Sequence, residues 1–241
     1  MENIHNMVIS DVHLESEDCR PDLLLMVLEN YFYDELIIDG DLREKGEIIN
    51  SKNLGVVEYL LENNKKIIYV DGNHDPAGKK FVGKILGIKT LKKYRWKVNG
   101  KKFCAIHGHQ FDRFLFIFSE PLIDKMISKL FLLAQKIDQK KLHIAKWIDD
   151  FHNRLSHNIA KKAIKYAKKH HIDVIICGHT HKPAHIIDYD EKRRRTVEYF
   201  NCGDWTNGIC SFITISEDGK AELHLVMKKP GTNLYTFKKV A

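Results

Sequence analysis

Short apolar runs and amphipathic stretches alternate along the first 70 residues of the chain. Runs rich in β-branched residues predict strands, and apolar residues that recur every three or four positions predict helices. The expected order is a strand in HNMVIS (5–10), a helix in PDLLLMVLENY (21–31), a strand in ELIID (35–39), a helix in SKNLGVVEYLLENN (51–64) and a strand in KKIIYV (65–70). This βαβαβ order predicts a mainly parallel sheet with helices on its faces.

The β-pattern continues further along the chain. The segment YRWKV-NG-KKFCAI (94–106) predicts a hairpin, because Asn-Gly is the preferred two-residue hairpin turn. DVIICG (173–178) predicts a further strand. Four more β-rich segments follow up to residue 227, with the turn-like stretches DEKRRR and SEDG between them.

A helical segment interrupts this pattern at about residues 111–171. Apolar residues recur at helical spacing in SEPLIDKMISKLFLLAQKI (119–137), where Ser119 caps the helix and Pro121 fits its first turn. A second amphipathic stretch covers residues 145–171. We therefore expect a single domain, residues 1–241, with a helical cap insertion. The apolar residues of the cap either pack between its helices or form an acyl-chain groove or a membrane contact.

Composition narrows the class of protein. An apolar fraction of 44% and a charged fraction of 29% are ordinary for a soluble globular protein. The net charge of +7 and the pI near 9.0 favour an anionic partner: nucleic acid, a phosphorylated metabolite or an anionic membrane surface. The five cysteines are widely spaced and predict reduced thiols in a reducing compartment. MENIHNMVISD resembles no secretory signal, so we expect a cytoplasmic location.

Each expected strand around the middle of the sheet is followed by a cluster of polar residues. The five clusters are SDVHL, DGDLRE, DGNHD, IHGHQFD and CGHTHKP. Ligands of open α/β sheets bind beyond the carboxyl ends of the strands, so we expect the clusters to converge in space. Their candidate residues are Asp11, His13, Asp41, Asn73, His74, Asp75, His107, His109, His179 and His181.

The residue types in these clusters favour a metal centre. Asp, His and Asn suit divalent manganese, iron or zinc, and the absence of cysteine argues against a closed structural zinc site. In D-V-H (11–13) and H-T-H (179–181), side chains two residues apart point the same way if the backbone is extended. Glycines at 40, 72, 108 and 178 let the backbone turn sharply beside them. Two metals ~3.5–4 Å apart would clamp both oxygens of a phosphoryl transfer.

The ordered series D-x-H, G-D, G-N-H-D, H and G-H-x-H, between residue 8 and about residue 205, resembles the calcineurin-like metallophosphoesterase superfamily. The resemblance implies an α/β fold, a β-sandwich flanked by helices (αββα). It also implies two divalent metal ions, of which manganese is the first choice and iron or zinc are the alternatives. It implies one metal on Asp11, His13, Asp41 and His181, and a second on Asp41, Asn73, His107 and His179, so that Asp41 bridges.

The resemblance also implies a mechanism. A hydroxide that bridges the two metals attacks phosphorus in line, without a covalent enzyme intermediate. His74 is expected to face the phosphate, where it stabilises charge or protonates the leaving oxygen. Asp75 is expected to orient His74.

Within the superfamily, the layout is similar to the UDP-2,3-diacylglucosamine diphosphatases, through the helical insertion between His107 and His179 and the NCGDW block at 201–205. That similarity implies a lipid-linked diphosphate substrate, a cap over an acyl-chain groove and peripheral contact with the inner face of the membrane. His74 stands where that subgroup typically carries Arg, and His109 where it often carries Asp. The alternatives are a general phosphodiesterase or phosphatase acting on nucleotides or nucleic acid, and a non-enzymatic scaffold of the same fold.

Other residues have a functional and a structural interpretation. His109, Arg113, Arg154 and Lys182 are candidates for substrate contact, and each is alternatively an exposed polar residue. AKKAIKYAKKHH (160–171) is either a solvated helix face or a contact with anionic lipid.

Overall fold

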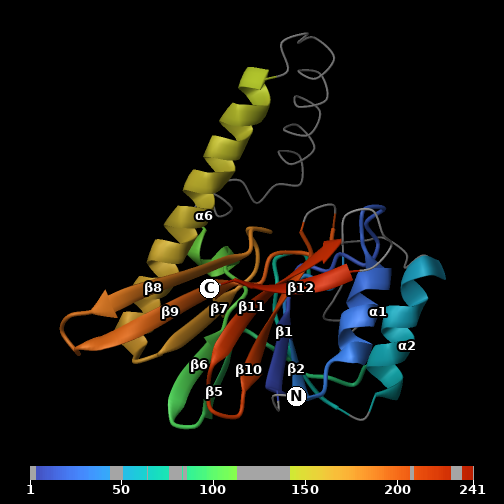
Figure 1. The fold of residues 1–241 in the computed structure, drawn as a ribbon, viewed down its shortest axis with the longest axis horizontal. Coiled ribbons are helices and arrows are strands. Elements are labelled where there is room, and N and C mark those ends of the chain that lie inside the picture. Colours follow the sequence, from blue (N-terminus) through green and yellow to red (C-terminus); the bar gives the residue numbers. More distant parts are fainter. Residues whose placement is uncertain are drawn as a thin grey trace.

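The computed structural model describes residues 4–43, 51–63, 65–75, 83, 86–112, 142–206, 209–228 and 235–240. Two β-sheets pack face to face, with helices α1 and α2 on the outside of one sheet and α6 against the other (Figure 1). This arrangement confirms the expected αββα sandwich.

The larger sheet has seven strands in the order β12-β11-β10-β1-β2-β3-β4. Its parallel part is limited to β1 through β4, and β10 pairs with β1 in the antiparallel sense. The strands are β1 (Ile4–Ile9), β2 (Tyr33–Asp39), β3 (Lys66–Val70), β4 (Thr90–Leu91), β10 (Ser211–Ser216), β11 (Ala221–Lys228) and β12 (Tyr235–Val240).

The smaller sheet has five strands in the order β5-β6-β7-β9-β8. Strands β6, β7 and β9 are parallel, and β5 and β8 form the antiparallel edges. The strands are β5 (Tyr94–Val98), β6 (Lys101–Ala105), β7 (Val174–Cys177), β8 (Ala184–Asp190) and β9 (Arg195–Asn201). Asn99 and Gly100 both have positive φ, at 47° and 80°, as the expected two-residue turn between β5 and β6 requires.

Three apolar layers hold the sandwich together. Helix α1 (Pro21–Asn30) begins with proline, whose missing N–H costs nothing in the first turn, and buries Leu24 and Leu28 against the larger sheet. Helix α2 (Leu54–Glu62), which follows the 3-10 turn η1 (Ser51–Asn53), covers the same face. Val8, Ile37 and Phe103 belong to the layer between the two sheets.

Helix α6 (Leu142–His170) forms the third layer with the smaller sheet. Ala160, Ala163 and Ala167 are buried along its second half, where small side chains let the helix approach β7 and β9 closely. Its first half extends beyond the sheets (Figure 1). Within the part of the chain described, no helix combines the length and apolar content needed to cross a bilayer.

The expected helix at 119–137 lies outside the described residues, so the limits of the cap insertion stay a prediction. The structure adds β4 and β12, which the sequence pattern missed. β4 has two residues, and β12 alternates intermediate and exposed positions without a buried face.

Candidate metal centre

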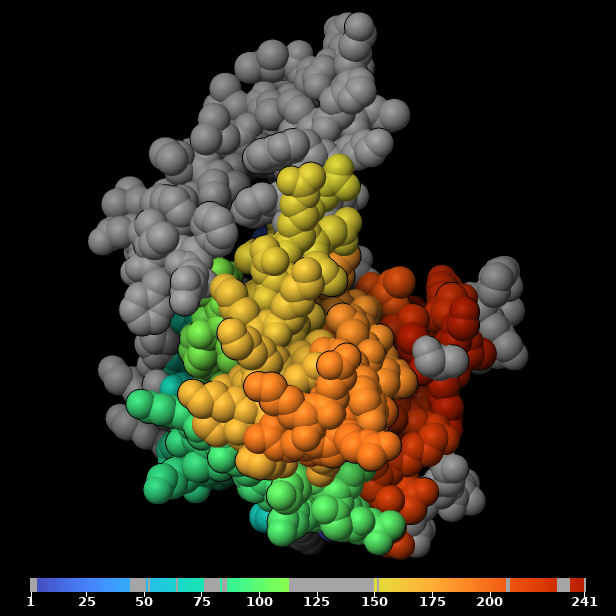
Figure 2. Space-filling model, turned by 90° about the vertical axis from the view of Figure 1, so that its left-hand side faces the viewer, coloured from blue at the N-terminus to red at the C-terminus, as the bar shows by residue number. Residues whose placement is uncertain are grey.

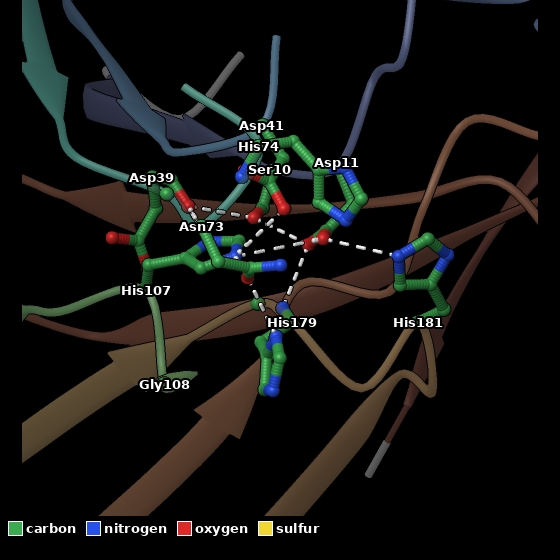
Figure 3. Close-up of polar contacts among 12 residues, drawn as sticks. Ser10, Asp11, Asp39, Asp41, Asn73, His74, His107, Gly108, His179 and His181 are labelled. Atoms are coloured by element: carbon green, nitrogen blue, oxygen red, sulfur yellow. Dashed lines mark hydrogen bonds and ion pairs between the residues drawn. The ribbon is translucent and has the colours of Figure 1, made fainter. Parts of the chain in front are cut away.

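The five polar clusters converge at one end of the sandwich, beyond the carboxyl ends of β1, β2, β3, β6 and β7 (Figure 3). Hydrogen bonds and ion pairs link the seven expected ligands into one connected group, in which Asp11 joins the two halves through His107 and His179. The expected convergence is therefore confirmed, while metal binding by these residues stays a prediction. The seven are Asp11, His13, Asp41, Asn73, His107, His179 and His181.

Asp11 lies at the middle of this group and is fully buried. Its Oδ2 accepts hydrogen bonds from the Ser10 hydroxyl at 2.6 Å and the His179 backbone N–H at 2.9 Å. Its Oδ1 faces the Nε2 atoms of His181 at 3.2 Å and of His13 and His107 at 3.9 Å each. One oxygen is thus fixed by two donors, and the other points at three imidazole nitrogens.

The outer ring nitrogens of two histidines determine which tautomer points inward. His107 Nδ1 lies 2.6 Å from the carbonyl oxygen of Asp39, and His181 Nδ1 lies 3.0 Å from Oδ2 of Asp204. Because a carbonyl and a carboxylate only accept, each Nδ1 carries a hydrogen, and each neutral ring presents the lone pair of Nε2 to the group.

Asp41, Asn73 and His179 form the other side of the centre. Asp41 Oδ2 lies 3.1 Å from His107 Nε2. Asn73 Oδ1 lies 3.2 Å from His107 Nε2 and 2.9 Å from His179 Nδ1. These contacts again bring acceptor atoms together around a shared space.

Convergent acceptor atoms fit divalent cations. Two groups of three ligand atoms lie within 4.8 Å of one another: Asp11, His13 and His181, and Asp11, Asp41 and His107. The expected division into two metal positions is consistent with these groups, but Asp11 belongs to both of them, and a bridging role of Asp41 stays a prediction.

Without a cation the centre attracts protons. Burial alone would lower the pKa of His107, but the charges of Asp41 and Asp11 raise it well above 6.5. Burial also opposes the charge of His181, whose hydrogen bonds to Asp11 and Asp204 raise its pKa to about 10. Burial would raise the pKa of Asp11, but His107 and His181 lower it. The two histidine shifts favour positive charge inside the group and the Asp11 shift keeps its carboxylate ionised, so the group has the charge pattern that a divalent ion would complete.

The backbone at the centre departs from the extended form. Asp11, His13, Asp41, His179 and His181 all have φ between 50° and 68°, in the left-handed region that side chains rarely adopt. The condition of extended backbone for the D-x-H and H-x-H pairs is therefore wrong. Sharp left-handed turns, and not strand alternation, bring these side chains together; such strained positions cluster at functional sites.

Two glycines allow the close approach of these turns. A Cβ on Gly72 would lie 2.0 Å from Asp41 Oδ1, and a Cβ on Gly178 would lie 1.9 Å from Ser10 Oγ and 2.3 Å from Asp11 Oδ2. Both positions therefore exclude any larger residue without displacement of a ligand.

His74 and Asp75 take different positions beside the centre. The His74 ring meets the His13 ring edge-on, with centroids 5.4 Å apart, and its backbone N–H donates to Asp41 Oδ1 at 2.9 Å. The buried Asp75 carboxylate accepts from the Tyr69 hydroxyl at 2.7 Å and from the backbone N–H groups of Gly72 and Asp41. These bonds fix the loop after β3, and the orientation of His74 by Asp75 stays a prediction.

The weaker candidates are distributed more widely. The His109 ring lies 5.5 Å from the His107 ring and 6.3 Å from the His179 ring, measured between centroids. Lys182 donates a hydrogen bond to Asn153 on α6. Arg154 is exposed on the same helix, and Arg113 lies outside the described residues. Of the three that the structure describes, His109 is the one whose ring lies beside the rings of two ligand candidates.

Three buried carboxylates beside the centre were not identified from the sequence. Asp112 and Asp204 contact His179 and His181. Within the described chain, neither side-chain oxygen of Asp39 has a hydrogen-bond partner, and burial raises its pKa to about 8. Asp39 directly precedes Gly40 and Asp41 in the sequence DGD, next to a ligand candidate. The apolar pattern predicts it as the last residue of a strand, so it was not identified as a functional residue.

Comparisons with known proteins agree with this geometry. A family model described as calcineurin-like phosphoesterase matches residues 5–183. UDP-2,3-diacylglucosamine hydrolase of Psychromonas ingrahamii is 26% identical over 93% of this chain and 98% of its own length. Two crystal structures of Vps29 share the fold. That of a single mutant from Entamoeba histolytica has a TM-score of 0.51 and 16% identity, and the match covers 98% of this chain and 97% of that one. That of the Chaetomium thermophilum protein with a cyclic peptide has a TM-score of 0.50 and 12% identity, and the match covers 98% of this chain and 94% of that one.

Proposed function

Because the chain belongs to the calcineurin-like phosphoesterase family, we propose that it hydrolyses phosphoester or diphosphate bonds. We propose that it uses two divalent metal ions for this reaction and that manganese is the preferred ion. The observation that carries the proposal is the environment of Asp11 Oδ1, which faces Nε2 atoms of three histidines at 3.2–3.9 Å. A buried carboxylate oxygen surrounded by imidazole nitrogens requires positive charge, which protons supply in the metal-free protein and a divalent ion can supply in their place. Imidazole with carboxylate suits manganese, iron or zinc.

The chain divides the chemical tasks among its residues. Asp11, His13 and His181 would hold one ion, and Asp41, Asn73, His107 and His179 the other. Bound there, the ions supply Lewis-acid charge and an activated water for in-line attack on phosphorus. The His74 side chain, beside His13, would stabilise charge on the phosphoryl oxygens or donate a proton to the leaving oxygen.

For the substrate, we propose a diphosphate that links a nucleotide to a lipid or sugar. The full-length similarity to a UDP-2,3-diacylglucosamine hydrolase supports this class. The second candidate is a phosphodiesterase or phosphatase acting on nucleotides or nucleic acid, which the net charge of +7 favours equally. A non-enzymatic scaffold is the third, and the presence of all seven ligand side chains in one connected group argues against it.

A substrate panel tests the proposal. Metal-free protein is loaded with manganese and assayed with a bis-aryl phosphate, UDP-2,3-diacylglucosamine and free nucleotides. We expect metal-dependent turnover that Asp11→Asn abolishes and that Asp188→Asn, which removes an ion pair with Lys168 on the protein surface, leaves unchanged. A protein that binds manganese and hydrolyses none of the three contradicts the proposed function. Faster turnover of the nucleotides than of the lipid substrate supports the second candidate.

We also propose that the protein works in the cytoplasm and contacts the membrane peripherally, through a basic face formed by α6 and the β5–β6 hairpin, which lie on the same side of the molecule (Figure 2). Lys93 and Arg95 both donate to the Tyr166 hydroxyl, at 3.0 and 2.7 Å, and neither has a carboxylate partner among the described residues. Partial desolvation, followed by the charges of Arg95 and Lys169, lowers the pKa of His170 beside them. Unpaired positive charge of this kind attracts anionic lipid.

Vesicle co-sedimentation tests the membrane contact. We expect binding to vesicles with anionic lipid, little binding to zwitterionic vesicles, and weaker binding of the double variant Lys93→Gln, Arg95→Gln. The control Lys220→Gln, Lys239→Gln removes two lysines that pair with Glu222 on the larger sheet. Equal binding of all three proteins contradicts the assignment of this face.

A further inference from the structure

We propose that Asp112 and Asp204 are positioning residues, and that each holds one histidine ligand of a different metal position. Neither belongs to the ligand set that the sequence indicates. The inference rests on the proposed metal centre, and it is independent of the substrate and of the reaction.

Asp204 fixes His181 from outside the centre. Its Oδ2 lies 3.0 Å from His181 Nδ1, while Nε2 of the same ring lies 3.2 Å from Asp11 Oδ1 and 3.3 Å from His13 Nε2. The carboxylate therefore holds the proton of His181 on Nδ1 and turns the lone pair of Nε2 inward. A carboxylate acceptor also makes the ring a stronger ligand.

Asp204 is itself well anchored. Its side chain is 8% exposed, and its Oδ2 accepts the Thr206 hydroxyl at 2.5 Å. The backbone N–H of Trp205, the next residue, donates to the carbonyl oxygen of Asp11 at 3.1 Å. The loop that carries Asp204 is thus tied to the loop that carries Asp11 and His13. This geometry fixes the distance between His181 and the other ligands of its metal position.

Asp112 contacts His179 as Asp204 contacts His181, but at Nε2 of the ring instead of Nδ1. Its Oδ2 lies 3.4 Å from His179 Nε2, and the Nδ1 of that ring lies 2.9 Å from Asn73 Oδ1. Asp112 is 4% exposed, and its backbone N–H closes the 3-10 turn η2 (His109–Phe111) on the carbonyl oxygen of His109 at 3.0 Å. Here the carboxylate favours the proton on Nε2 and leaves Nδ1 to bind metal.

A contact with α6 holds this second pair in place. The Lys162 ammonium donates to the carbonyl oxygen of Phe111 at 2.8 Å, and the Phe111 and Tyr166 rings meet with centroids 5.7 Å apart. Helix α6 therefore fixes η2, and η2 fixes Asp112 against His179.

The two acid–histidine pairs serve different metal positions. His181 shares its ligand group with Asp11 and His13, whereas His179 contacts Asn73, which contacts His107. The proton of His107 is held on Nδ1 in the same way, by the backbone carbonyl oxygen of Asp39. Loss of one carboxylate is therefore expected to weaken one metal position and to leave the other near its original affinity.

Manganese titrations of the metal-free full chain test this assignment without any measurement of turnover. We compare Asp112→Asn and Asp204→Asn, which keep the side-chain shape, with Asp188→Asn, which removes a surface ion pair with Lys168. We expect each site variant to weaken one of two binding steps about 10- to 100-fold and the control to leave both steps unchanged. Circular dichroism and thermal unfolding of the metal-free forms establish that each variant folds.

Double mutants identify which step is affected. In a His181→Ala background, Asp204→Asn is expected to cause no further loss of manganese affinity, whereas Asp112→Asn still weakens the step that is left. In a His179→Ala background the pattern reverses.

Two results overturn the proposal. One is unchanged manganese affinity in both Asn variants and in folded Asp112→Ala and Asp204→Ala proteins. The other is an equal loss at both steps from either variant, which indicates a general structural role. If the variants behave as expected while every phosphoester resists hydrolysis, the proposed function fails and the positioning roles stand.

Discussion

Asp11 shows how one side chain serves both the fold and the chemistry. Its Oδ2 accepts donors from Ser10 and from the loop after β7, so it joins the two sheets at their ligand-bearing ends. Its Oδ1 is left for a cation. Burial of this carboxylate is tolerated because opposite charge surrounds it, which lowers its pKa in spite of desolvation. The most buried acid of the expected ligand set is therefore also the one that joins its two halves.

His74 and Asn73 give a sharp pair of variants at this scale. The bond that fixes Asp41 comes from the backbone N–H of His74, so His74→Ala removes the ring and keeps that bond. We expect His74→Ala to bind two manganese ions with near-native affinity and to lose ~10²- to 10⁴-fold in turnover, the usual contribution of an acid–base group. Titration calorimetry and kinetics on the same preparation measure both quantities.

Asn73→Ala, one residue away, is the matched comparison. It removes the oxygen that lies between His107 and His179, so we expect weaker manganese binding as well as lower turnover. Loss of metal in His74→Ala would show that this histidine is a ligand and that its proposed role is wrong.

The order of short motifs was sufficient to identify the seven ligand candidates. Asp112 and Asp204 could not be assigned a role in the same way, because their partners lie 67 and 23 residues away in the chain. Asp39 reads as the end of a strand, and its desolvation depends on the second sheet that covers it. Short local motifs therefore indicate which residues are ligand candidates, whereas the residues that orient each candidate are apparent only from the tertiary structure.

At the scale of elements, the turns after the strands build the centre. In the turns after β2 and β7, a ligand candidate in left-handed conformation, Asp41 or His179, directly follows a glycine, Gly40 or Gly178, and the missing side chain lets the loops approach closely. The sequence predicted these turns from their glycines, but not their left-handed ligands.

Gly178 offers a test of this packing. A Cβ at Gly178 would overlap Ser10 Oγ and Asp11 Oδ2, so we expect Gly178→Ala to lower stability by about 1–3 kcal/mol and to weaken manganese binding. Urea unfolding and manganese titration measure the two effects. The control is Gly83→Ala, where an added Cβ meets no atom within 4 Å. Equal stability of the two variants would show that the turn after β7 can move without loss.

Most strands and helices followed from apolar periodicity or from short apolar runs, because each buries apolar side chains in one or two of the three layers. Strand β12 has no fully buried position, although Tyr235 and Phe237 pack against the core, and the two residues of β4 are too few to show a pattern. The antiparallel pairing of β10 with β1 joins segments more than 200 residues apart, and no local pattern encodes that choice.

At the scale of the whole molecule, the metal centre links stability to pH. In the metal-free protein, the pKa of His107 lies well above 6.5 and that of His181 is about 10. Groups with a raised pKa stabilise the fold fully below their unfolded value, near 6.5, and this contribution is lost as pH rises through the folded value. Asp39, with a pKa of about 8, adds to the loss between pH 6.5 and 8, because its buried carboxyl must ionise.

Thermal unfolding between pH 6.5 and 10 checks this linkage. We expect the melting temperature of metal-free protein to fall by ~5 °C or more across this range. The manganese-loaded protein is expected to show a smaller fall, because the ions replace the protons of the two histidines, and manganese affinity should rise with pH as those protons become easier to displace. Parallel curves for the two forms would contradict a shared site for protons and metal.

The placement of α6 also bears on how this chain can be divided and recombined. Its second half belongs to the core, and Lys162 and Tyr166 hold the turn that leads to Asp112. An excision of the whole segment 111–171 would therefore remove core residues together with a neighbour of His179. A chimaera that exchanges the cap would therefore have to keep Asp112 and the part of α6 from Ile159 onward, so that the neighbour of His179 and the buried face of the helix are retained.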